Sequence, residues 1–396
     1  MRVLLIHNRY RSSSPSGEDH VVDQESAALA ADGHTVEHFE RRSDDIGNAS
    51  LLRRAMVPAQ VLWSEEARRS LARVLRIFRP DVAHVHNTFP LLSPSVLYAG
   101  RAEGVPLVAT LHQYRLICPR GDLFRDGGVC HDCVGRVPLP AVRHGCYRDS
   151  SAATLPVAAS VISHRRTWRR LVSAYIFLSR AQCDLFPPGM FPSHRIFIKP
   201  NFVPDVSSRA DRRDDIVVYA GRLTDTKGLD VLMTAWDLYS RGPTSGLRLQ
   251  LAGAGPMEAE VAAWAAAHPT VDCLGALSRS DCASLIARAR AVIVPSRWEE
   301  TFGLVAVEAM AAGVAPVASA RGSFCELITD RSDGVLFEPE SATALADVLR
   351  EVLERPEEYE KYGRVARRTY EERFSPQGNV KQLLRIYEFA VRNPAH

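Results

Sequence analysis

The sequence lacks the long hydrophobic run that a membrane-spanning helix needs. No stretch approaches 18 consecutive apolar residues. The start, Met-Arg-Val-Leu-Leu-Ile-His-Asn, is too short and too quickly polar for a secretory signal. We therefore expect a soluble, cytoplasmic protein. The chain has 396 residues, of which 46% are hydrophobic and 24% charged, so it has a globular composition and enough length for two domains.

Lysine is scarce, since only four of the 49 basic residues are lysines. We therefore expect a lysine that stands inside a motif, such as Lys227, to have a function there. Residues 1–200 carry 26 Lys and Arg against 18 Asp and Glu, whereas residues 201–396 carry 23 against 28. The basic first half fits an anionic acceptor or a membrane surface, but arginines scattered over solvated helices give the same balance.

Two familiar motifs are also missing. The sequence has no Gly-x-Gly-x-x-Gly after its first expected strand, which argues against a dinucleotide-dependent oxidoreductase. It has no Asp-x-Asp pair to hold a divalent cation. We therefore expect no catalytic divalent metal.

Short apolar runs alternate with helical patterns along most of the chain, which predicts βαβ units and parallel sheets. We expect two Rossmann-like, doubly wound α/β domains that face each other across a cleft. The first spans residues 1–200, has an irregular insertion at 112–150, and also includes the C-terminal helix expected at 375–396. The second spans 201–374. Expected strands are 2–7, 35–39, 82–86, 106–111, 175–179, 216–220, 248–252, 271–274, 291–295 and 315–319. Expected helices include 18–32, 51–78, 95–103, 152–170, 228–239, 257–268, 279–289 and 303–312.

The first candidate site follows the first strand of the second domain and reads Ala-Gly-Arg-Leu-Thr-Asp-Thr-Lys-Gly from Ala220. Gly221 permits a tight turn, and the cations Arg222 and Lys227 stand near the start of a helix. Both features suit a polyphosphate. The alternative is an ordinary loop with two solvated cations.

The second candidate site begins at Pro295 and reads Pro-Ser-Arg-Trp-Glu-Glu-Thr-Phe-Gly-Leu. Glu300 lies just before a helix start, where the backbone N–H groups of Phe302, Gly303 and Leu304 can hold a diphosphate. Glu308 lies inside this apolar helix, and a buried carboxylate needs partners.

Together these motifs, with Ala-Gly-Ala-Gly-Pro at 252–256, closely resemble glycosyltransferase family 4, whose members are retaining enzymes of the two-domain GT-B fold. The resemblance spans essentially the whole chain. Its strand-end histidine motifs match His-Val-His-Asn at 84–87 and Thr-Leu-His at 110–112, and its interdomain signature matches residues 199–205, with Phe202 in place of a glycine. The first loop, Ser16-Gly17-Glu18, departs from the family's Gly-Gly pattern.

The resemblance implies a role for each matching residue. Arg222 and Lys227 bind the donor diphosphate, Glu308 holds the ribose hydroxyls, and Glu300 holds the sugar. The remaining residues implied to contact the donor are Gly17, His112, Gly221, Gly253, Phe302, Gly303 and Leu304. His84 and His86 keep a structural interpretation.

The resemblance further implies transfer of a sugar, with retention, from a nucleotide-diphosphate sugar to a hydroxyl acceptor on an envelope glycan, a lipid or a secondary metabolite. A sugar-nucleotide epimerase or phosphorylase of the same fold is one alternative. A non-catalytic sugar-nucleotide-binding protein is another.

Four of the eight cysteines (Cys118, Cys130, Cys133 and Cys146) fall in the irregular insertion, two of them as Cys-x-x-Cys. In a cytoplasmic chain this grouping predicts a structural zinc site. Free thiols and labile disulfides are the alternatives. A second surface feature, the basic segment 164–170 with Trp168, fits either a lipid headgroup or a solvated helix face.

Overall fold

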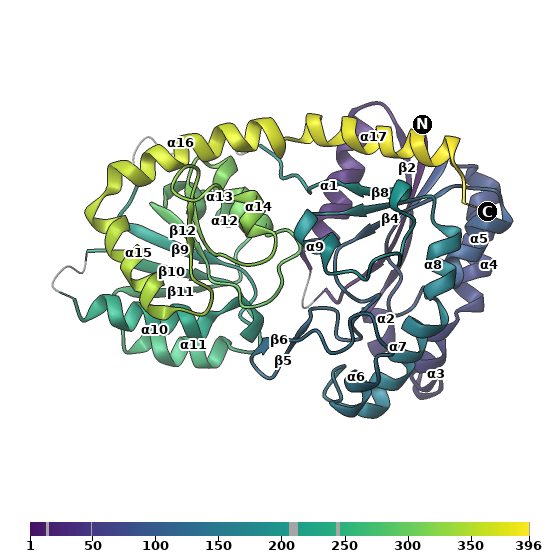
Figure 1. Cartoon of the computed structure of the whole chain (residues 1–396), viewed down its shortest axis with the longest axis horizontal. Coiled ribbons are helices and arrows are strands. Elements are labelled where there is room, and N and C mark those ends of the chain that lie inside the picture. The colour runs from purple at the N-terminus through teal and green to yellow at the C-terminus, as the bar shows by residue number, and fades with distance from the viewer. Residues whose placement is uncertain (13–15, 49, 206–212, 243–245, 396) are drawn as a thin grey trace. The chain divides into compact units, whose positions relative to one another are not determined.

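The computed structural model describes residues 1–12, 16–48, 50–205, 213–242 and 246–395. The chain divides into two compact units (Figure 1). Unit 1 contains residues 1–125, 130–200 and 379–396, and unit 2 contains residues 126–129 and 201–378.

Unit 1 is built on a six-stranded sheet with the order β2-β1-β3-β4-β7-β8, and all its strand pairs are parallel. Every residue of β3 and β4 is buried, as expected for strands covered by helices on both faces. The short strand β8 was not predicted, because three residues are too few to show an apolar periodicity. The strands are β1 (Arg2–Arg9), β2 (Thr35–Arg42), β3 (Val82–Asn87), β4 (Leu107–Leu111), β7 (Ala174–Phe177) and β8 (Ile196–Ile198).

The C-terminal helix α17 (Pro376–Arg392) packs on this sheet. Its apolar stripe, which includes Val380, Leu383 and Tyr387, shares one buried cluster with Val3 of β1 and Val22 of α1. Figure 1 shows α17 and α1 close to the same strands. The other helices of unit 1 are α1 (Gly17–Ala31), α2 (Asp44–Asn48), α3 (Leu51–Leu62), α4 (Glu65–Phe78), α5 (Ser95–Ala102), α6 (Leu139–Arg143), α7 (Ser151–Ser163), α8 (Arg165–Leu171) and α9 (Arg180–Asp184).

Two predicted long helices are each broken in two. The expected helix 51–78 becomes α3 and α4 because Ser64 caps α4, with its side chain accepting the N–H of Ala67 at 3.3 Å. The expected helix 152–170 becomes α7 and α8. The break lies at His164, whose Nε2 bonds the carbonyl of Leu62 at 2.8 Å.

The insertion at 112–150 contains little regular structure, as predicted. Its regular elements in the described residues are the paired strands β5 (Phe124–Arg125) and β6 (Gly128–Val129) and the helix α6.

Unit 2 is a second six-stranded sheet with the order β11-β10-β9-β12-β13-β14, and its strand pairs are also parallel. Its core includes Trp236 and Tyr239, both fully buried. The strands are β9 (Ile216–Ala220), β10 (Arg248–Ala252), β11 (Val271–Gly275), β12 (Ala291–Val294), β13 (Ala315–Ser319) and β14 (Val335–Phe337). The helices are α10 (Leu229–Ser240), α11 (Glu258–Ala266), α12 (Arg279–Arg288), α13 (Leu304–Ala311), α14 (Phe324–Leu327), α15 (Ala342–Glu354) and α16 (Pro356–Arg373).

Both units are thus Rossmann-like, with helices on both faces of a parallel sheet (Figure 1). None of the helices in the described ranges is both long enough and apolar enough to cross a membrane.

Candidate active site

The loop that follows β9 is held by backbone contacts with the loop after β10. Leu223 donates its N–H to the carbonyl of Ala254 at 3.0 Å, and the hydroxyl of Tyr219 donates to the carbonyl of Arg222 at 2.7 Å. A Cβ atom on Gly253 would overlap the carbonyl oxygen of Gly221. The two predicted glycines therefore allow a close approach of the loops, and the Arg222 side chain is left exposed beside them.

Lys227 is tied to the second motif by an ion pair. Its Nζ lies 2.9 and 3.0 Å from the two carboxylate oxygens of Glu300. The Trp298 indole N–H also donates to Glu300, and Lys227 Nζ lies 5.4 Å from the centre of the Trp298 ring. A Cβ on Gly228 would overlap the carbonyl of Pro295. The two motifs, 73 residues apart in the chain, form one charged corner.

The N-terminus of α13 lies directly after this corner. Gly303 adopts φ +90°, and a Cβ there would overlap the ring of Phe324, so glycine is needed to start the helix. The carbonyl of Phe302 accepts the Ser323 hydroxyl at 2.7 Å. From Leu304 onward the first N–H groups of the helix have no partner within it, and they carry its positive partial charge. This end of α13 is suited to an anion.

Glu308 lies one turn further along α13 and is mostly withdrawn from solvent. Burial raises the pKa of its carboxyl, and the nearby Arg279 of α12 opposes that rise only in part. The sequence analysis did not identify Arg279, because an arginine after the helix-capping Ser278 carries no pattern of its own. A buried carboxylate with a single charged neighbour is suited to accept hydrogen bonds from a ligand's hydroxyls.

The structure therefore brings together the predicted residues of unit 2 at the carboxyl ends of its strands, where ligands of open α/β sheets bind. Cations and a helix N-terminus lie beside two carboxylates. This arrangement can bind a polyphosphate together with hydroxyl groups.

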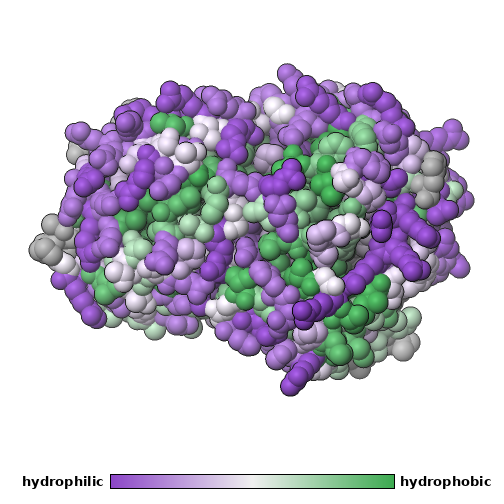
Figure 2. Space-filling view, viewed as in Figure 1, coloured by the Kyte–Doolittle hydropathy of each residue, from purple (hydrophilic) through white to green (hydrophobic). Residues whose placement is uncertain are grey.

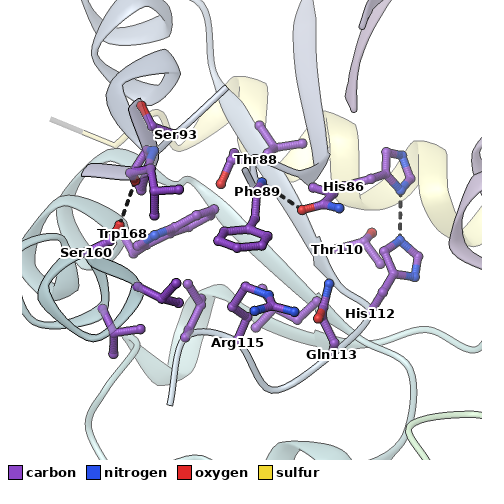
Figure 3. Close-up of a pocket in the computed structure, with 18 of the residues that line it drawn as sticks. His86, Thr88, Phe89, Ser93, Thr110, His112, Gln113, Arg115, Ser160 and Trp168 are labelled. Atoms are coloured by element: carbon purple, nitrogen blue, oxygen red, sulfur yellow. Dashed lines mark hydrogen bonds between the residues drawn. The ribbon is translucent and has the colours of Figure 1, made fainter. Parts of the chain in front are cut away.

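The histidines of unit 1 line a separate pocket (Figure 3). His86 ends β3 and His112 follows β4, and the two rings stack with Nδ1 of His86 3.0 Å from Nε2 of His112. Burial lowers the pKa of His86 to about 3 and lowers that of His112 well below its ordinary value. Both imidazoles are therefore neutral. The pocket is also lined by Thr88, Phe89, Ser93, Thr110, Gln113, Arg115, Ser160 and Trp168.

The predicted loop residue Gly17 is the first residue of α1, one residue earlier than expected. Ser16 caps this helix in a capping box with Asp19. The next residue, Glu18, was not singled out from the sequence. Burial raises the pKa of Glu18 to about 7, although it accepts a hydrogen bond from the Tyr10 hydroxyl at 3.0 Å.

One group of side chains in the described residues is close enough to share a metal ion. Glu25, His84 and His86 place ligand atoms within 4.8 Å of one another, all buried. However, Nζ of Lys199 lies 3.6 Å from the Glu25 carboxylate and already supplies a positive charge. We therefore assign no metal to these residues.

The four clustered cysteines of the insertion are free thiols in the structure, and zinc binding by them stays a prediction. A tetrahedral site with Zn–S distances of about 2.3 Å brings its sulfur atoms within about 4 Å of one another. Among the described residues, no three cysteine sulfurs lie within 4.8 Å of each other, and Cys118, Cys130, Cys133 and Cys146 are all free thiols. Burial, reinforced by the neighbouring thiols of Cys118, Cys146 and Cys130, raises the pKa of Cys133 to about 11, so the four thiols lie close enough to affect one another.

Two family models match the chain, one on each side of the segment around residue 200. Residues 16–189 match the Glycosyl transferase 4-like domain, and residues 205–369 match Glycosyl transferases group 1. Among curated proteins, the glycogen synthase of Mycobacterium tuberculosis is 25% identical, with 99% of this chain and 95% of that protein covered. The D-inositol 3-phosphate glycosyltransferase of a Nocardioides species is 28% identical, over 82% of this chain and 70% of its own.

Solved structures share the architecture at lower identity. Sucrose-phosphate synthase from Thermosynechococcus elongatus is 19% identical with a TM-score of 0.69, and 98% of each chain is covered. Anabaena HepE in complex with UDP-glucose is 18% identical with a TM-score of 0.66, over 98% of this chain and 99% of that one. Together, the matches to both halves and the paired Rossmann-like units show that the chain belongs to the family-4-type glycosyltransferases of the GT-B fold.

Proposed function

We propose that this glycosyltransferase takes its sugar from a nucleotide-diphosphate sugar bound at unit 2. The observation that carries the proposal is the charged corner, where Lys227 is fixed by Glu300 next to the N-terminus of α13. Arg222 lies exposed at the end of β9. The bond between sugar and phosphate breaks with growing negative charge on the diphosphate, so fixed cations and a helix N-terminus lower the barrier.

The roles in the donor site follow from the chemistry of each group. Arg222, Lys227 and the N–H groups at the start of α13 bind the diphosphate. Glu308 accepts hydrogen bonds from the ribose hydroxyls, since its carboxylate lies buried beside Arg279. Glu300 and the backbone at Phe302 and Gly303 hold the sugar hydroxyls. UDP and UDP-glucose are bound by HepE, which supports a nucleotide sugar as the donor here.

We further propose that the pocket of unit 1 presents the acceptor and that His112 lies beside the reacting face of the sugar. Support comes from the neutral imidazole at the pocket wall and from Arg115, whose guanidinium lies 4.2 Å from the centre of the Phe89 ring. Gly17, at the start of α1, lets this part of unit 1 approach the phosphates. The relatives named glycogen synthase and D-inositol 3-phosphate glycosyltransferase support a polyhydroxylated acceptor.

The proposed reaction retains the anomeric configuration and uses no catalytic divalent metal, since Arg222 and Lys227 take the place of the cation. Incubation with a donor and a simple alcohol in EDTA tests both points. Proton NMR of the product should show the same anomer as the donor. An inverted product would contradict retention, and activity that is lost in EDTA and restored by Mg²⁺ would contradict metal independence.

We also propose that unit 1 contacts an anionic membrane surface. Figure 2 shows hydrophobic surface exposed where Figure 1 draws α6 and α7, and Leu139 and Leu155 there are 68% and 58% exposed. Helix α8, which follows α7 in the chain, contributes Arg166, Arg169 and Arg170 to a pocket that Arg195 also lines. Apolar and basic groups together favour binding to anionic lipid. The protein should sediment with phosphatidylglycerol vesicles, and Leu155→Glu should weaken this. An equal amount pelleting with phosphatidylcholine vesicles would contradict the proposal.

A panel of nucleotide-diphosphate sugars tests the proposed function. A donor present at 100 times its Kd stabilises the folded protein by about 2.7 kcal/mol, so the true donor should raise Tm while other nucleotides raise it less. Release of the nucleoside diphosphate with a new glycoside should follow when an acceptor is added. Conversion of the donor to its epimer would favour the epimerase alternative, and binding without any turnover would favour a non-catalytic sugar-nucleotide-binding protein.

A further inference from the structure

A buried ion pair lies behind the histidines of unit 1. Glu25 of α1 is 2% exposed, and its Oε2 lies 3.6 Å from Nζ of Lys199, whose side chain is 3% exposed. Its Oε1 lies 2.9 Å from Nδ1 of His84 and 3.4 Å from Nε2 of His86. Burial opposes ionisation of Glu25, but His84 and Lys199 outweigh it and hold the pKa of this carboxyl well below its ordinary value. Glu25 is therefore ionised.

An ionised carboxylate can only accept hydrogen bonds, so it fixes where the neighbouring protons lie. His86 is neutral and carries one ring proton. Its Nε2 is buried, has no hydrogen-bond partner among the described atoms, and faces the negative Oε1 of Glu25. The proton is therefore favoured on Nε2, and Nδ1 of His86 carries the lone pair.

The tautomer of His86 determines the tautomer of His112. Nδ1 of His86 lies 3.0 Å from Nε2 of His112, as the dashed line in Figure 3 shows. Since Nδ1 of His86 accepts, Nε2 of His112 must donate. His112 is also neutral and has no second ring proton, so its Nδ1 carries a lone pair and can only accept a hydrogen bond.

We propose that Glu25 is a positioning residue: acting through His86, it fixes His112 as the Nε2–H tautomer, so that Nδ1 of His112 is the ring atom that can only accept a hydrogen bond. A hydroxyl of the sugar or of the acceptor molecule that reaches this nitrogen must therefore donate to it. Contact with the donor sugar rests on the proposed function, whereas the tautomer itself does not. Lys199 and His84 hold Glu25 in place. The hydroxyl oxygen of Thr110 lies 2.7 Å from Nε2 of His84, on the other side of that ring.

Proton–nitrogen NMR of the full chain, labelled with ¹⁵N at histidine, tests this without any substrate. His112→Gln identifies the signals of His112 by their loss. In the unsubstituted protein the Nε2–H form of His112 should be the main form, because the reverse arrangement would turn the lone pair on Nε2 of His86 toward the negative carboxylate of Glu25. A proton found on Nδ1 of His112 would overturn the proposal.

Two substitutions sharpen this test. Glu25→Gln removes the charge and lets the amide donate to His86, so both rings can reverse and the excess of the Nε2–H form should fall to less than about threefold. Glu25→Asp restores the charge and should restore the excess. Thr110→Val is the matched control: it removes a contact with His84, but Lys199 still pairs with Glu25, so the tautomer of His112 should stay unchanged. A folded Glu25→Gln protein that keeps the original tautomer would contradict the role of Glu25.

If Glu25→Gln does not fold, His86→Gln interrupts the same series of contacts one residue later and should also reduce the excess of the Nε2–H form. An unchanged tautomer of His112 in His86→Gln would overturn the proposal.

Failure of this proposal and failure of the proposed function are separate results. The tautomer is observed in the protein alone, so a chain without transferase activity can still show it. Conversely, an active transferase in which His112 carries its proton on Nδ1 would leave the proposed function standing and remove only the role of Glu25.

Discussion

The two units share one architecture but place their polar groups differently. In unit 2 the cation Arg222 is exposed, and Lys227 and Glu300 lie in loops beyond the strand ends. In unit 1 Glu25 and Lys199 are inside the unit and neutralise each other. In unit 2 the exposed Arg222 can therefore give its positive charge to a ligand, beside a Lys227 that Glu300 already holds, whereas the pocket of unit 1 offers neutral imidazoles.

The largest expected effect comes from removing a cation of unit 2. Arg222→Ala or Lys227→Ala should lower the turnover of the donor by about 10²-fold or more, because each acts as a preorganised charge for the leaving diphosphate. Nucleotide release under saturating donor measures this. Arg248→Ala removes an exposed arginine paired with Asp272 in the same unit and should leave the rate unchanged.

Near-normal rates in both Arg222→Ala and Lys227→Ala would contradict the assignment of the diphosphate to this corner. A similar loss of turnover in Arg248→Ala would show that removing any positive charge from unit 2 slows the reaction. That result would equally contradict the assignment.

A smaller effect is expected from the buried carboxyl of Glu18 in unit 1. Its pKa rises from 4.5 to about 7 because of burial, so the folded state binds more protons than the unfolded state between these pH values. The contribution of Glu18 to stability is therefore present below pH 4.5 and lost as the pH rises through 7. Relative to Glu18→Gln, the unsubstituted protein should lose about 2 kcal/mol of unfolding free energy between pH 5 and pH 7. Urea unfolding of both proteins at the two pH values measures this, and parallel pH dependences would contradict a buried, titrating Glu18.

The smallest expected effect concerns Glu308, the carboxylate of unit 2 that we propose binds the ribose hydroxyls. Glu308→Gln keeps the shape and one acceptor oxygen but loses the charge, so donor binding should weaken about tenfold. The change should appear in KM for the donor, with kcat largely kept, because the ribose is remote from the breaking bond. Glu299→Gln, which makes the same change in the loop before α13, is the control. A fall in kcat at unchanged KM would place Glu308 nearer to the chemistry.

The grouping of the candidate site residues of unit 2 could be predicted from the sequence because its parts are local. Each motif is a contiguous loop at a strand end, and parallel strands bring such loops to one edge of the sheet. What it did not predict is the contact between Lys227 and Glu300, or the position of Arg279 beside Glu308. These depend on how side chains pack across 73 and 29 residues of chain.

The contacts of Glu25 with Lys199, His84 and His86 in unit 1 were harder to predict from the sequence. His84 and His86 were interpreted as structural, and both are buried at the end of β3. Nothing near them in the sequence points to Glu25 in α1 or to Lys199. The scarcity of lysine was the available signal for Lys199. The cysteine spacing, in contrast, predicted that four thiols gather in the insertion, and the other three do lie close enough to Cys133 to raise its pKa. Zinc binding there stays a prediction, because spacing alone does not fix the distances between sulfurs.

The central claim is that the charged corner of unit 2 binds the diphosphate of a nucleotide sugar. Isothermal titration calorimetry tests it most directly, with the donor identified from the panel and with the unsubstituted protein, Lys227→Ala and Arg248→Ala. We predict that Lys227→Ala weakens binding at least about tenfold, the loss of one charge-assisted contact, and that Arg248→Ala binds as the unsubstituted protein does. Equal affinity in all three proteins, or no binding of any nucleotide-diphosphate sugar, would contradict the claim.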